Sequence, residues 1–289
     1  MGTIPTINLH LTAKCNYHCR FCFAHFNFVE DSLKPKDKEK LIKAICEQPE
    51  IKKINFVGGE PTLIPGLDEY LKMAHTLNKT TSVTTNGSLI TPEWIQKYSS
   101  VLDILAISID SDDHSTNIAS GRCDKNGQTI NQEHYCRISK ACHESGIILK
   151  VNTVVSSFNV NEKMTALVNR LSPERWKVFQ ALRVKGENSD ISAQYEISNR
   201  EYNSYIERNR EGLKPSISMI AEGNELMRGS YLMVNPEGCF FDNVKGGYTV
   251  SEPILKVGFK KAISQVSADY NLFVLRGGAY LINDGIINK

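Results

Sequence analysis

The sequence predicts an α/β fold built on a mainly parallel β-sheet. Six short runs of apolar and β-branched residues recur along the first two thirds of the 289-residue chain, and amphipathic helical patterns separate them. Parallel strands need such helical crossovers, so the alternation predicts a sheet that is either open or curled into a partial barrel. Sheets of this kind place their active sites at the carboxyl ends of the strands. The predicted strands are TINLHLT from Thr6, KKINFV to Val57, TSVTT from Thr81, DILAISID to Asp110, ILKVNTVV (148–155) and WKVFQALRV (176–184).

The helical patterns carry recognisable end signals. Thr91 followed by Pro92 is typical of an N-cap and a first helical position, and Gly146 is a candidate C-cap. Asn159 and Glu162 have the spacing of a capping box. The predicted helical segments are PKDKEKLIKAICEQ, LDEYLKMAHTL, TPEWIQKY, NQEHYCRISKACHESG and NVNEKMTALVNRL.

The last third of the chain has a different pattern. SNREYNSYIERNREG predicts a helix that begins with a Ser198–Glu201 capping box, and SYLMVNPEGCFF predicts a hairpin turning at Asn235–Gly238. FVLRGGAYLI predicts a strand pair or a strand and a turn. We therefore divide the chain into a core of residues 1–190 and an extension of residues 191–289 that is built onto the sheet.

Composition excludes several classes of partner. The net charge of +2, without a basic stripe rich in aromatic residues, gives no indication of nucleic-acid binding. No apolar stretch reaches the roughly 20 residues that a membrane span needs, and the N-terminal residues do not resemble a signal peptide. Eight cysteines without an export signal indicate reduced thiols, so we expect a cytoplasmic protein.

Three of the cysteines form the strongest local motif. Cys15, Cys19 and Cys22 fall within eight residues directly after the first predicted strand. A zinc knuckle needs a fourth ligand, and the chain has no second CxxC pair to supply it. A redox pair would use only Cys19 and Cys22. Three thiolates suit a [4Fe–4S] cluster with one open iron. We favour this interpretation over the zinc and redox alternatives.

Residues after the second predicted strand connect this motif to a known family. Gly58-Gly59-Glu60-Pro61 follows that strand, and together with the Cx3CxxC spacing it resembles the radical S-adenosylmethionine superfamily. In that superfamily the methionyl part of S-adenosylmethionine binds the open iron, and the glycine-rich element holds the methionine amine. The resemblance therefore implies a partial (β/α)6 barrel of the radical S-adenosylmethionine type, with a C-terminal extension that completes the substrate site.

Further segments resemble the viperin-like branch of this superfamily, in the same order and from about Thr3 to Tyr280. The resemblance implies an enzyme that removes the 4′ hydrogen of a nucleoside triphosphate with a 5′-deoxyadenosyl radical. Loss of the 3′ hydroxyl as water and one further electron would give a 3′-deoxy-3′,4′-didehydro nucleotide, an antiviral chain terminator. An electron donor such as a flavodoxin or ferredoxin is implied as a partner. The segments are NFVGGEP, TTNGSLI, LDILAISIDS, VNTVVSSFNV, ERWKVFQ, KGEN, SYLMV and RGGAY.

The resemblance also implies residues that bind S-adenosylmethionine. Two glycines let a ligand approach the backbone, and the carboxylate of Glu60 would face the methionine ammonium. Phe21 would pack against adenine, and Arg122 would pair with the methionine carboxylate. Asn86, after the third predicted strand, and Ser108, at the end of the fourth, would hydrogen-bond ribose or carboxylate. The full set of expected cofactor-binding residues is Phe21, Gly58, Gly59, Glu60, Asn86, Ser108 and Arg122.

A triphosphate would need several cations from different strands. Lys150 and Lys177 are the clearest candidates, because they interrupt apolar strand runs where an unpaired ammonium is costly. Gly277-Gly278 would bring backbone N–H groups to phosphate oxygens. Tyr231 is our candidate catalytic residue, as a proton or electron donor to the sugar radical. The expected substrate-binding residues are Asn8, Lys53, Lys150, Arg175, Lys177 and Arg276.

Two other functions remain open at this stage. One is a radical S-adenosylmethionine enzyme that modifies a peptide or a tRNA base, although the last third of the chain has only Cys239 and therefore lacks the cysteines of an auxiliary cluster. The other is a non-catalytic iron–sulfur protein that senses a nucleotide.

Overall fold

One curved sheet of ten strands organises the molecule, in the order β10-β9-β8-β1-β2-β3-β4-β5-β6-β7. The computed structural model describes residues 3–29 and 32–279. Strands β1 to β7 pair in parallel with their sequence neighbours, β8 adds in parallel to the free side of β1, and β9 and β10 continue antiparallel. The strands are β1 (Thr6–His10), β2 (Lys53–Val57), β3 (Thr80–Thr85), β4 (Ile104–Ser108), β5 (Ile148–Val155), β6 (Arg175–Gln180), β7 (Ser218–Glu222), β8 (Leu232–Val234), β9 (Cys239–Asp242) and β10 (Thr249–Pro253).

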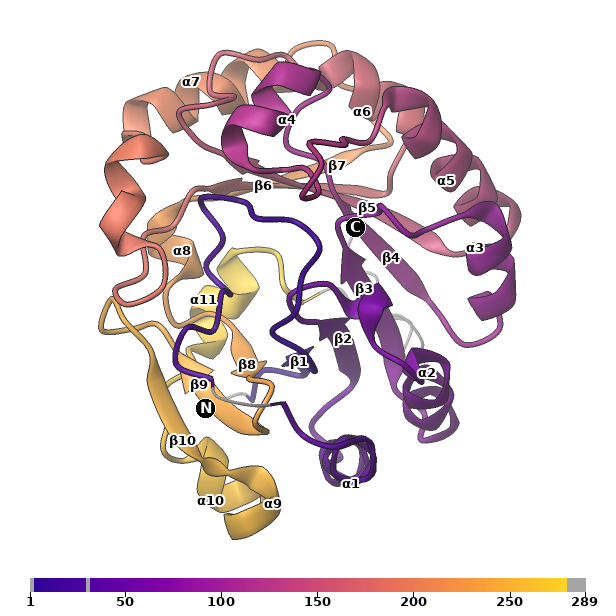
Figure 1. Ribbon diagram of the computed structural model, residues 1–289, viewed down its shortest axis with the longest axis vertical. Coiled ribbons are helices and arrows are strands. Elements are labelled where there is room, and N and C mark those ends of the chain that lie inside the picture. Colours follow the sequence, from indigo (N-terminus) through magenta and orange to yellow (C-terminus); the bar gives the residue numbers. More distant parts are fainter. Residues whose placement is uncertain (1–2, 30–31, 280–289) are drawn as a thin grey trace.

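The sheet follows an arc, and most helices cover its outer face (Figure 1). This arrangement is a partial barrel that is not closed, as expected from the sequence. Within the described residues, none of the helices combines the length and the apolar character that crossing a membrane requires. The helices are α1 (Pro35–Cys46), α2 (Leu67–Thr76), α3 (Pro92–Tyr98), α4 (His114–Ser120), α5 (Gln132–Glu144), α6 (Thr165–Leu171), α7 (Asn199–Arg210), α8 (Asn224–Met227), α9 (Ile254–Val257), α10 (Phe259–Ile263) and α11 (Tyr270–Leu275), with short 3₁₀ turns at η1 (Pro61–Leu63) and η2 (Ser189–Gln194).

Most of the end signals act as predicted. The Thr91 side chain caps α3 with Pro92 in its first turn, and Ser198 and Glu201 form the reciprocal capping box of α7. Gly146 follows the end of α5 with φ +69°, a conformation that favours glycine. The Asn235 side chain accepts hydrogen bonds from the backbone N–H of Glu237 and Cys239, which fixes the predicted turn between β8 and β9.

Several elements differ from the sequence prediction, which also did not include α4, α8, α9, α10 and β10. Helix α6 begins only at Thr165, so the predicted Asn159–Glu162 capping box is wrong. The Asn159 amide instead donates to the backbone carbonyls of Asp110 and Val154 and ties the ends of β4 and β5. Strand β7 was not predicted. The segment predicted as a strand from Phe273 instead lies in helix α11 and the turn after it, and the rest of that prediction, from Tyr280, lies outside the described residues.

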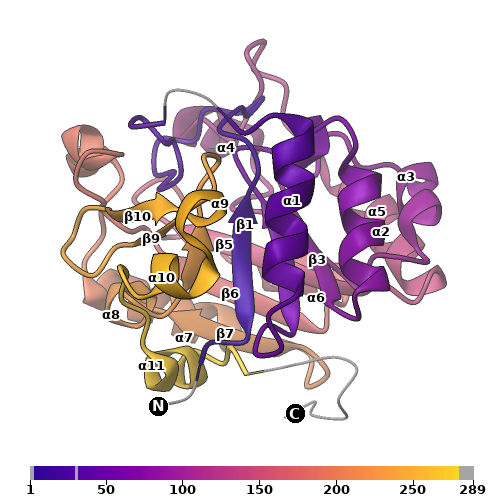
Figure 2. The ribbon, with the colours of Figure 1, turned by 90° about the horizontal axis from the view of Figure 1, so that it is seen from below.

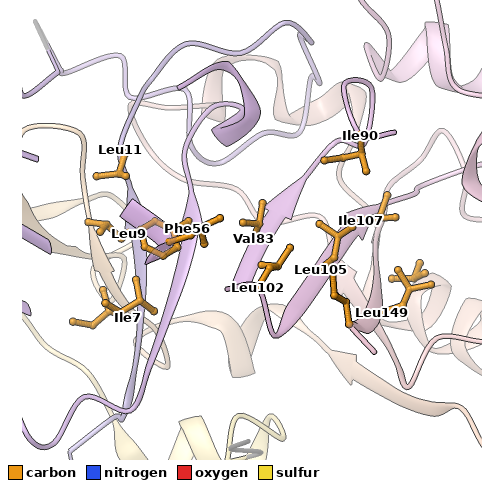
Figure 3. Close-up of a cluster of buried hydrophobic side chains, with 14 of the residues drawn as sticks. Ile7, Leu9, Leu11, Phe56, Val83, Ile90, Leu102, Leu105, Ile107 and Leu149 are labelled. Carbon is orange, nitrogen blue, oxygen red and sulfur yellow. The ribbon is translucent and has the colours of Figure 1, made fainter. Parts of the chain in front are cut away.

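The strands divide their side chains between two faces. On β1, Ile7 and Leu9 pack into the apolar core between sheet and helices, whereas Asn8 and His10 face the inside of the barrel. Figure 3 shows this core, in which side chains from successive strands form a continuous apolar layer. Because side chains alternate along a strand, every second residue is available to line the interior. The core residues labelled in the figure are Ile7, Leu9, Leu11, Phe56, Val83, Ile90, Leu102, Leu105, Ile107 and Leu149.

Helix α11 lies at the end of the barrel where the strands begin (Figure 2). Phe273 of this helix is buried, and together with Arg276 and Gly278 it lines the barrel interior beside Thr6 and Lys53, the first residues of β1 and β2. The chain therefore uses part of its extension to cover the amino-terminal end of the barrel.

The division between the two faces predicts a stability difference. Leu9→Ala removes a fully buried side chain from the core, and we expect it to lower the free energy of unfolding by about 2–5 kcal/mol. Leu89→Ala is the matched control, because that leucine is 45% exposed; its effect is expected to stay within about 0.5 kcal/mol. Urea unfolding followed by circular dichroism measures both. Equal effects of the two substitutions would contradict the assignment of the faces.

Candidate active site

The inner face of the sheet encloses a cavity of about 300 Å³. Its lining falls into three sets of residues along the strands. The loop that carries Cys15, Cys19 and Cys22 (the cysteine loop) lies at the carboxyl side together with the strand ends. A polar layer lies in the middle, and a set of cations lies at the amino-terminal side. Of the residues predicted for the site, all but Arg175 line this cavity: Asn8, Cys15, Cys19, Phe21, Cys22, Lys53, Gly58, Gly59, Glu60, Asn86, Ser108, Arg122, Lys150, Lys177, Tyr231 and Arg276.

The cysteine loop is held between two glycine segments. A Cβ on Gly59 would lie 2.4 Å from the carbonyl oxygen of Lys14, and one on Gly121 would lie 2.2 Å from that of His18. The backbone of the loop also bonds to both segments, through Gly59 N–H to Thr12 and His18 N–H to Gly121. The glycines therefore let the cysteine loop approach closely. Gly58 and Gly59 also line the cavity, and the approach of a ligand to their backbone stays a prediction.

The three thiols have the chemistry of cluster ligands. Burial raises the pKa of the Cys19 thiol to about 12 and that of Cys22 to about 11, and it also raises the pKa of Cys15, so the thiolates need a nearby positive charge. The charges of Cys22 and Cys15 also raise the pKa of the Cys19 thiol, so the three sulfur atoms lie near one another. A cluster whose irons each take one thiolate suits this arrangement.

Glu60 ties the ends of two strands. Its carboxylate accepts hydrogen bonds from the hydroxyl groups of Thr62 and Thr85 and from the backbone N–H of Thr62 and Asn86. Burial raises the pKa of this carboxyl, and the four bonds act against that shift. A carboxylate offers about four acceptor positions. Three of the four bonds reach Oε1 and one reaches Oε2, so Glu60 fixes the geometry of the strand ends while Oε2 keeps an acceptor position. Glu60 also lines the cavity, and its contact with an ammonium group stays a prediction.

Arg122 is oriented by a buried carboxylate. Its guanidinium contacts Asp110 through an Nε–H bond of 2.6 Å and through an ion pair of its terminal nitrogen. Its guanidinium carbon lies 5.7 Å from the ring centroid of Phe21, which is itself buried and packs on Ala181 and Tyr195. Arg122 therefore reaches the cavity beside the cysteine loop, but part of its hydrogen-bonding fork is committed to Asp110.

Asn86 and Ser108 lie at the carboxyl side of the cavity, as predicted. The Asn86 side chain donates to Asn16 of the cysteine loop at 2.8 Å and accepts from the Ser88 N–H at 2.9 Å. Ser108 is the last residue of β4 and is half-buried. Asn86 thus connects β3 to the loop that carries the cysteines, a contact that sequence reasoning did not anticipate.

A polar layer crosses the middle of the cavity. The Asn55 amide donates to Asn8 at 2.9 Å and accepts from the Thr84 hydroxyl at 3.1 Å, which links β1, β2 and β3. Asn152 lines the same cavity on β5, and its buried amide oxygen has no hydrogen-bond partner. Sequence reasoning missed Asn55 and Asn152. They lie two residues after Lys53 and Lys150, so each shares a strand face with a predicted substrate-binding lysine. This spacing could have identified both asparagines from the sequence.

Four cationic side chains gather at the amino-terminal side of the cavity. Lys53, Lys150, Lys177 and Arg276 come from four separate segments, and each is at most 9% exposed. Burial lowers the pKa of Lys150 to about 7, and the charges of Arg175 and Arg276 add to that shift against an opposing effect of Glu222.

The Arg175 guanidinium and the N–H groups of Gly277 and Gly278 make contacts within the chain, although Gly278 itself lines the cavity. The Arg175 guanidinium donates to the carbonyl of Gly277 at 2.8 Å. The N–H groups of Gly277 and Gly278 bond to the carbonyls of Val274 and Phe273 at the end of α11. These donors are therefore used within the chain and are not directed at a ligand as expected.

Tyr231 lies among three charged side chains, of which Lys177 and Arg276 were predicted and Glu222 was not. Its hydroxyl accepts a bond of 3.3 Å from Lys177 and donates to Glu222, and the guanidinium carbon of Arg276 lies 3.6 Å from its ring centroid. Glu222 was missed because it ends β7, the strand that the sequence pattern did not reveal.

Comparison with known proteins identifies the family. The Radical SAM superfamily profile matches residues 9–171. A protein of Flammeovirga pacifica named S-adenosylmethionine-dependent nucleotide dehydratase is 39% identical over 282 residues, which cover 96% of each chain. The RSAD2 protein of Siniperca chuatsi, with the same name, is 38% identical over 96% of this chain and 79% of its own. The chain belongs to this family. The predicted viperin-like membership is thus confirmed.

Solved structures agree on the fold. Native anSMEcpe with bound AdoMet superposes with a TM-score of 0.64 at 17% identity, over 82% of this chain and 73% of that one. Streptococcus suis SuiB bound to S-adenosylmethionine gives 0.61 at 17% identity, over 83% and 60%. Both likenesses concern the fold alone. Membership in the Radical SAM superfamily gives this nucleotide dehydratase family member a [4Fe–4S] cluster and S-adenosylmethionine as cofactors, as the cysteine motif indicated.

The glycine contacts predict that the loop geometry controls cluster binding. Gly59→Ala forces a methyl group against the Lys14 carbonyl and displaces the cysteine loop, so we expect at least a threefold loss of bound iron and sulfide after anaerobic reconstitution. Gly223→Ala is the matched control, since a Cβ there meets no atom closer than 3.6 Å. Iron and sulfide per chain are measured chemically. Full cluster content in Gly59→Ala would contradict this role.

Proposed function

We propose that this protein dehydrates a nucleoside triphosphate to its 3′-deoxy-3′,4′-didehydro analogue, a chain terminator that acts against viruses or phages. The family name supports the dehydration of a nucleotide. The cavity supports the triphosphate, because it combines a place for a radical-generating cofactor at one side with buried cations at the other.

The observation that carries the proposal is the set of buried cations that the described residues place at the amino-terminal side of the cavity. Four cations line this side, and the carboxylate of Glu222 lies beside them. Burying several cations close together is costly, and an anion that binds among them lowers this cost. The lowered pKa of Lys150 is the electrostatic sign of that cost. A triphosphate carries enough negative charge to balance Lys53, Lys150, Lys177 and Arg276.

In the proposed complex each set of lining residues binds a different part of the ligands. The cations bind the phosphates and thereby fix the height of the sugar in the barrel. Asn8, Asn55 and Asn152 offer polar groups to the sugar from the middle layer. Cys15, Cys19 and Cys22 would hold the cluster at the carboxyl side, with Phe21 and Arg122 beside the second cofactor. The cluster and S-adenosylmethionine supply the hydrogen-abstracting radical when they are bound.

Tyr231 has the position of a group that serves the sugar after hydrogen abstraction. It lines the cavity with its ring against Arg276 and its hydroxyl between Lys177 and Glu222. Its surroundings can supply a proton, since Lys177 and the phenol form one hydrogen-bonded unit. We assign Tyr231 as the proton donor to the leaving hydroxyl group.

A reducing partner and a reducing compartment follow from the same chemistry. The proposed reaction needs single electrons, which a flavodoxin or a ferredoxin supplies. All eight cysteines are free thiols in the structure. A cytoplasmic location keeps such thiols reduced and available to a cluster.

The direct test is anaerobic turnover. The reconstituted protein receives S-adenosylmethionine and dithionite, together with CTP, UTP, GTP or ATP in separate reactions. Mass spectrometry follows 5′-deoxyadenosine and a nucleotide lighter by one water. We expect both products with at least one triphosphate. Formation of 5′-deoxyadenosine without loss of water from any triphosphate would refute the proposed substrate and favour a peptide or tRNA base. No cleavage despite a full cluster would favour a nucleotide sensor.

The cation set predicts a pH-dependent affinity for triphosphates. Lys150 has a pKa of about 7 in the free protein, and a bound anion raises it. Below pH 7 the ammonium is already charged, whereas at pH 8 binding must take up a proton. We therefore expect the affinity to fall above pH 7, by up to about tenfold per pH unit. Calorimetry in buffers of different ionisation enthalpy measures the proton uptake at pH 6 and pH 8.

Two lysine variants control for the titration of the ligand. Lys150→Met lowers the proton uptake at pH 8, and Lys177, whose pKa burial also lowers to about 7, accounts for the uptake that remains. The substitution weakens binding by about 1.5–3 kcal/mol at pH 6.5. Lys140→Met on α5, where the side chain is 76% exposed, leaves both quantities unchanged. Identical proton uptake by the wild type and Lys150→Met would show that Lys150 does not face the bound phosphates.

A further inference from the structure

Glu222 lies directly behind the residues that line the cation side of the cavity. It is the last residue of β7 and is fully buried. Its carboxylate contacts three residues of the cavity wall: the ammonium of Lys177, the guanidinium of Arg276 at 3.8 Å and the hydroxyl of Tyr231. The carboxylate itself does not belong to the lining. It therefore acts on any ligand through these three partners.

The charges around Glu222 keep it ionised. Burial alone raises the pKa of the carboxyl, but Lys177 and Arg276 lower it further, so that it ends below its ordinary value. A buried carboxylate with two cations and a phenol around it has a fixed position, because each displacement breaks a charge-assisted contact. This fixed charge determines where the phenol and the ammonium lie.

Contacts with aromatic rings further restrict the positions of Lys177, Arg276 and Tyr231. The Lys177 ammonium lies 5.0 Å from the Phe179 ring centroid and 5.6 Å from that of Tyr231. Arg276 covers the Tyr231 ring and donates from Nε to the Ser230 carbonyl at 3.1 Å. The Tyr231 ring is thus held on one face, and its hydroxyl is held at both of its hydrogen-bonding positions.

We propose that Glu222 is a positioning residue for the dehydration step, which holds the Tyr231 hydroxyl and the Lys177 ammonium as one proton-donating unit. This inference rests on the proposed function. When the C3′–O bond of the sugar radical breaks, the oxygen leaves with the bonding electron pair. The Tyr231 O–H then turns from Glu222 to this oxygen, and its proton converts the oxygen to water. The Lys177 ammonium returns a proton to the phenolate. One electron from the flavodoxin- or ferredoxin-type donor then completes the didehydro sugar.

The proposal separates hydrogen abstraction from dehydration. Abstraction depends on the cofactor side of the cavity, whereas Glu222 acts only on the cation side. Because Lys177 and Arg276 also bind the phosphates in the proposed complex, the comparison is made at a nucleotide concentration that saturates each variant. Under that condition, loss of Glu222 should leave the formation of 5′-deoxyadenosine intact and reduce the amount of dehydrated nucleotide formed for each 5′-deoxyadenosine. We refer to this quantity as the coupling ratio.

The test compares the coupling ratio of Glu222→Gln and Glu222→Asp with that of the wild type. Glu222→Gln keeps the shape but removes the charge, and we expect it to lower the coupling ratio by about 10²-fold while 5′-deoxyadenosine forms within about twofold of the wild-type rate. Glu222→Asp keeps the charge and should recover part of the coupling. Glu225→Gln, an exposed position on α8, is the matched control and should couple as the wild type does.

A double variant tests whether the residues act as a unit. Tyr231→Phe should lower the coupling ratio as much as Glu222→Gln does, and combining the two should cause no further loss. Independent effects that multiply would overturn the proposal. So would wild-type coupling in Glu222→Gln, or a parallel fall of both products with an unchanged ratio, which indicates a purely structural role.

Two measurements show whether each variant is folded and binds nucleotide. Binding of CTP, UTP, GTP and ATP by the cofactor-free variants, together with their circular dichroism, reports whether they are folded. If Glu222→Gln does not fold, Glu222→Asp decides: full wild-type coupling overturns the proposal, and reduced coupling supports it. Failure of the proposed function is distinct, since the wild type itself would then form no dehydrated nucleotide from any triphosphate.

Discussion

The alternation of side chains along the parallel strands is the constraint on which the site depends. Each strand must bury one face against the helices, so its apolar residues occupy every second position and the intervening positions face the barrel interior. On β5, Leu149 and Val151 belong to the core, and Lys150 and Asn152 line the cavity. The same residues that give the barrel its stability therefore determine which side chains can reach a ligand. A shift of one residue in register would exchange the two sets.

Buried carboxylates hold the strand ends in place around this cavity. Glu60 joins the ends of β2 and β3, and Asp110 accepts from the Val154 N–H on β5 while it orients Arg122. Glu222 does the same for Tyr231 and Lys177 at the end of β7. A parallel sheet offers no tight turns that would fix its strand ends. Buried charges with several partners supply this rigidity, and each of them adjoins one set of the lining residues.

The sequence was informative where the signal is local. Strands with alternating or apolar patterns, caps such as Ser198–Glu201, and the spacing of Cys15, Cys19 and Cys22 follow from neighbouring residues. Roles that depend on packing between distant segments were not accessible: Gly59 and Gly121 clamp the cysteine loop, and the Glu60 carboxylate binds within the protein. Strand β7 and helix α11 were missed or misassigned, because β7 carries polar residues at its ends and because α11 is only six residues long.

The separation between the two sides of the cavity explains why cations far from the reacting bond matter to the proposed reaction. Lys150 lies four residues before Val154 on β5, a rise of roughly 13 Å along the strand. Binding energy gained from phosphates at the cation side can therefore place the sugar against the cofactor side. Of the four cations, only Lys177 takes part in the proposed proton transfer, through Tyr231. Glu222 has a place in the same scheme. By holding Lys177 and Tyr231 at a fixed height, it sets the level at which a proton is available, which is the level where the sugar must lie.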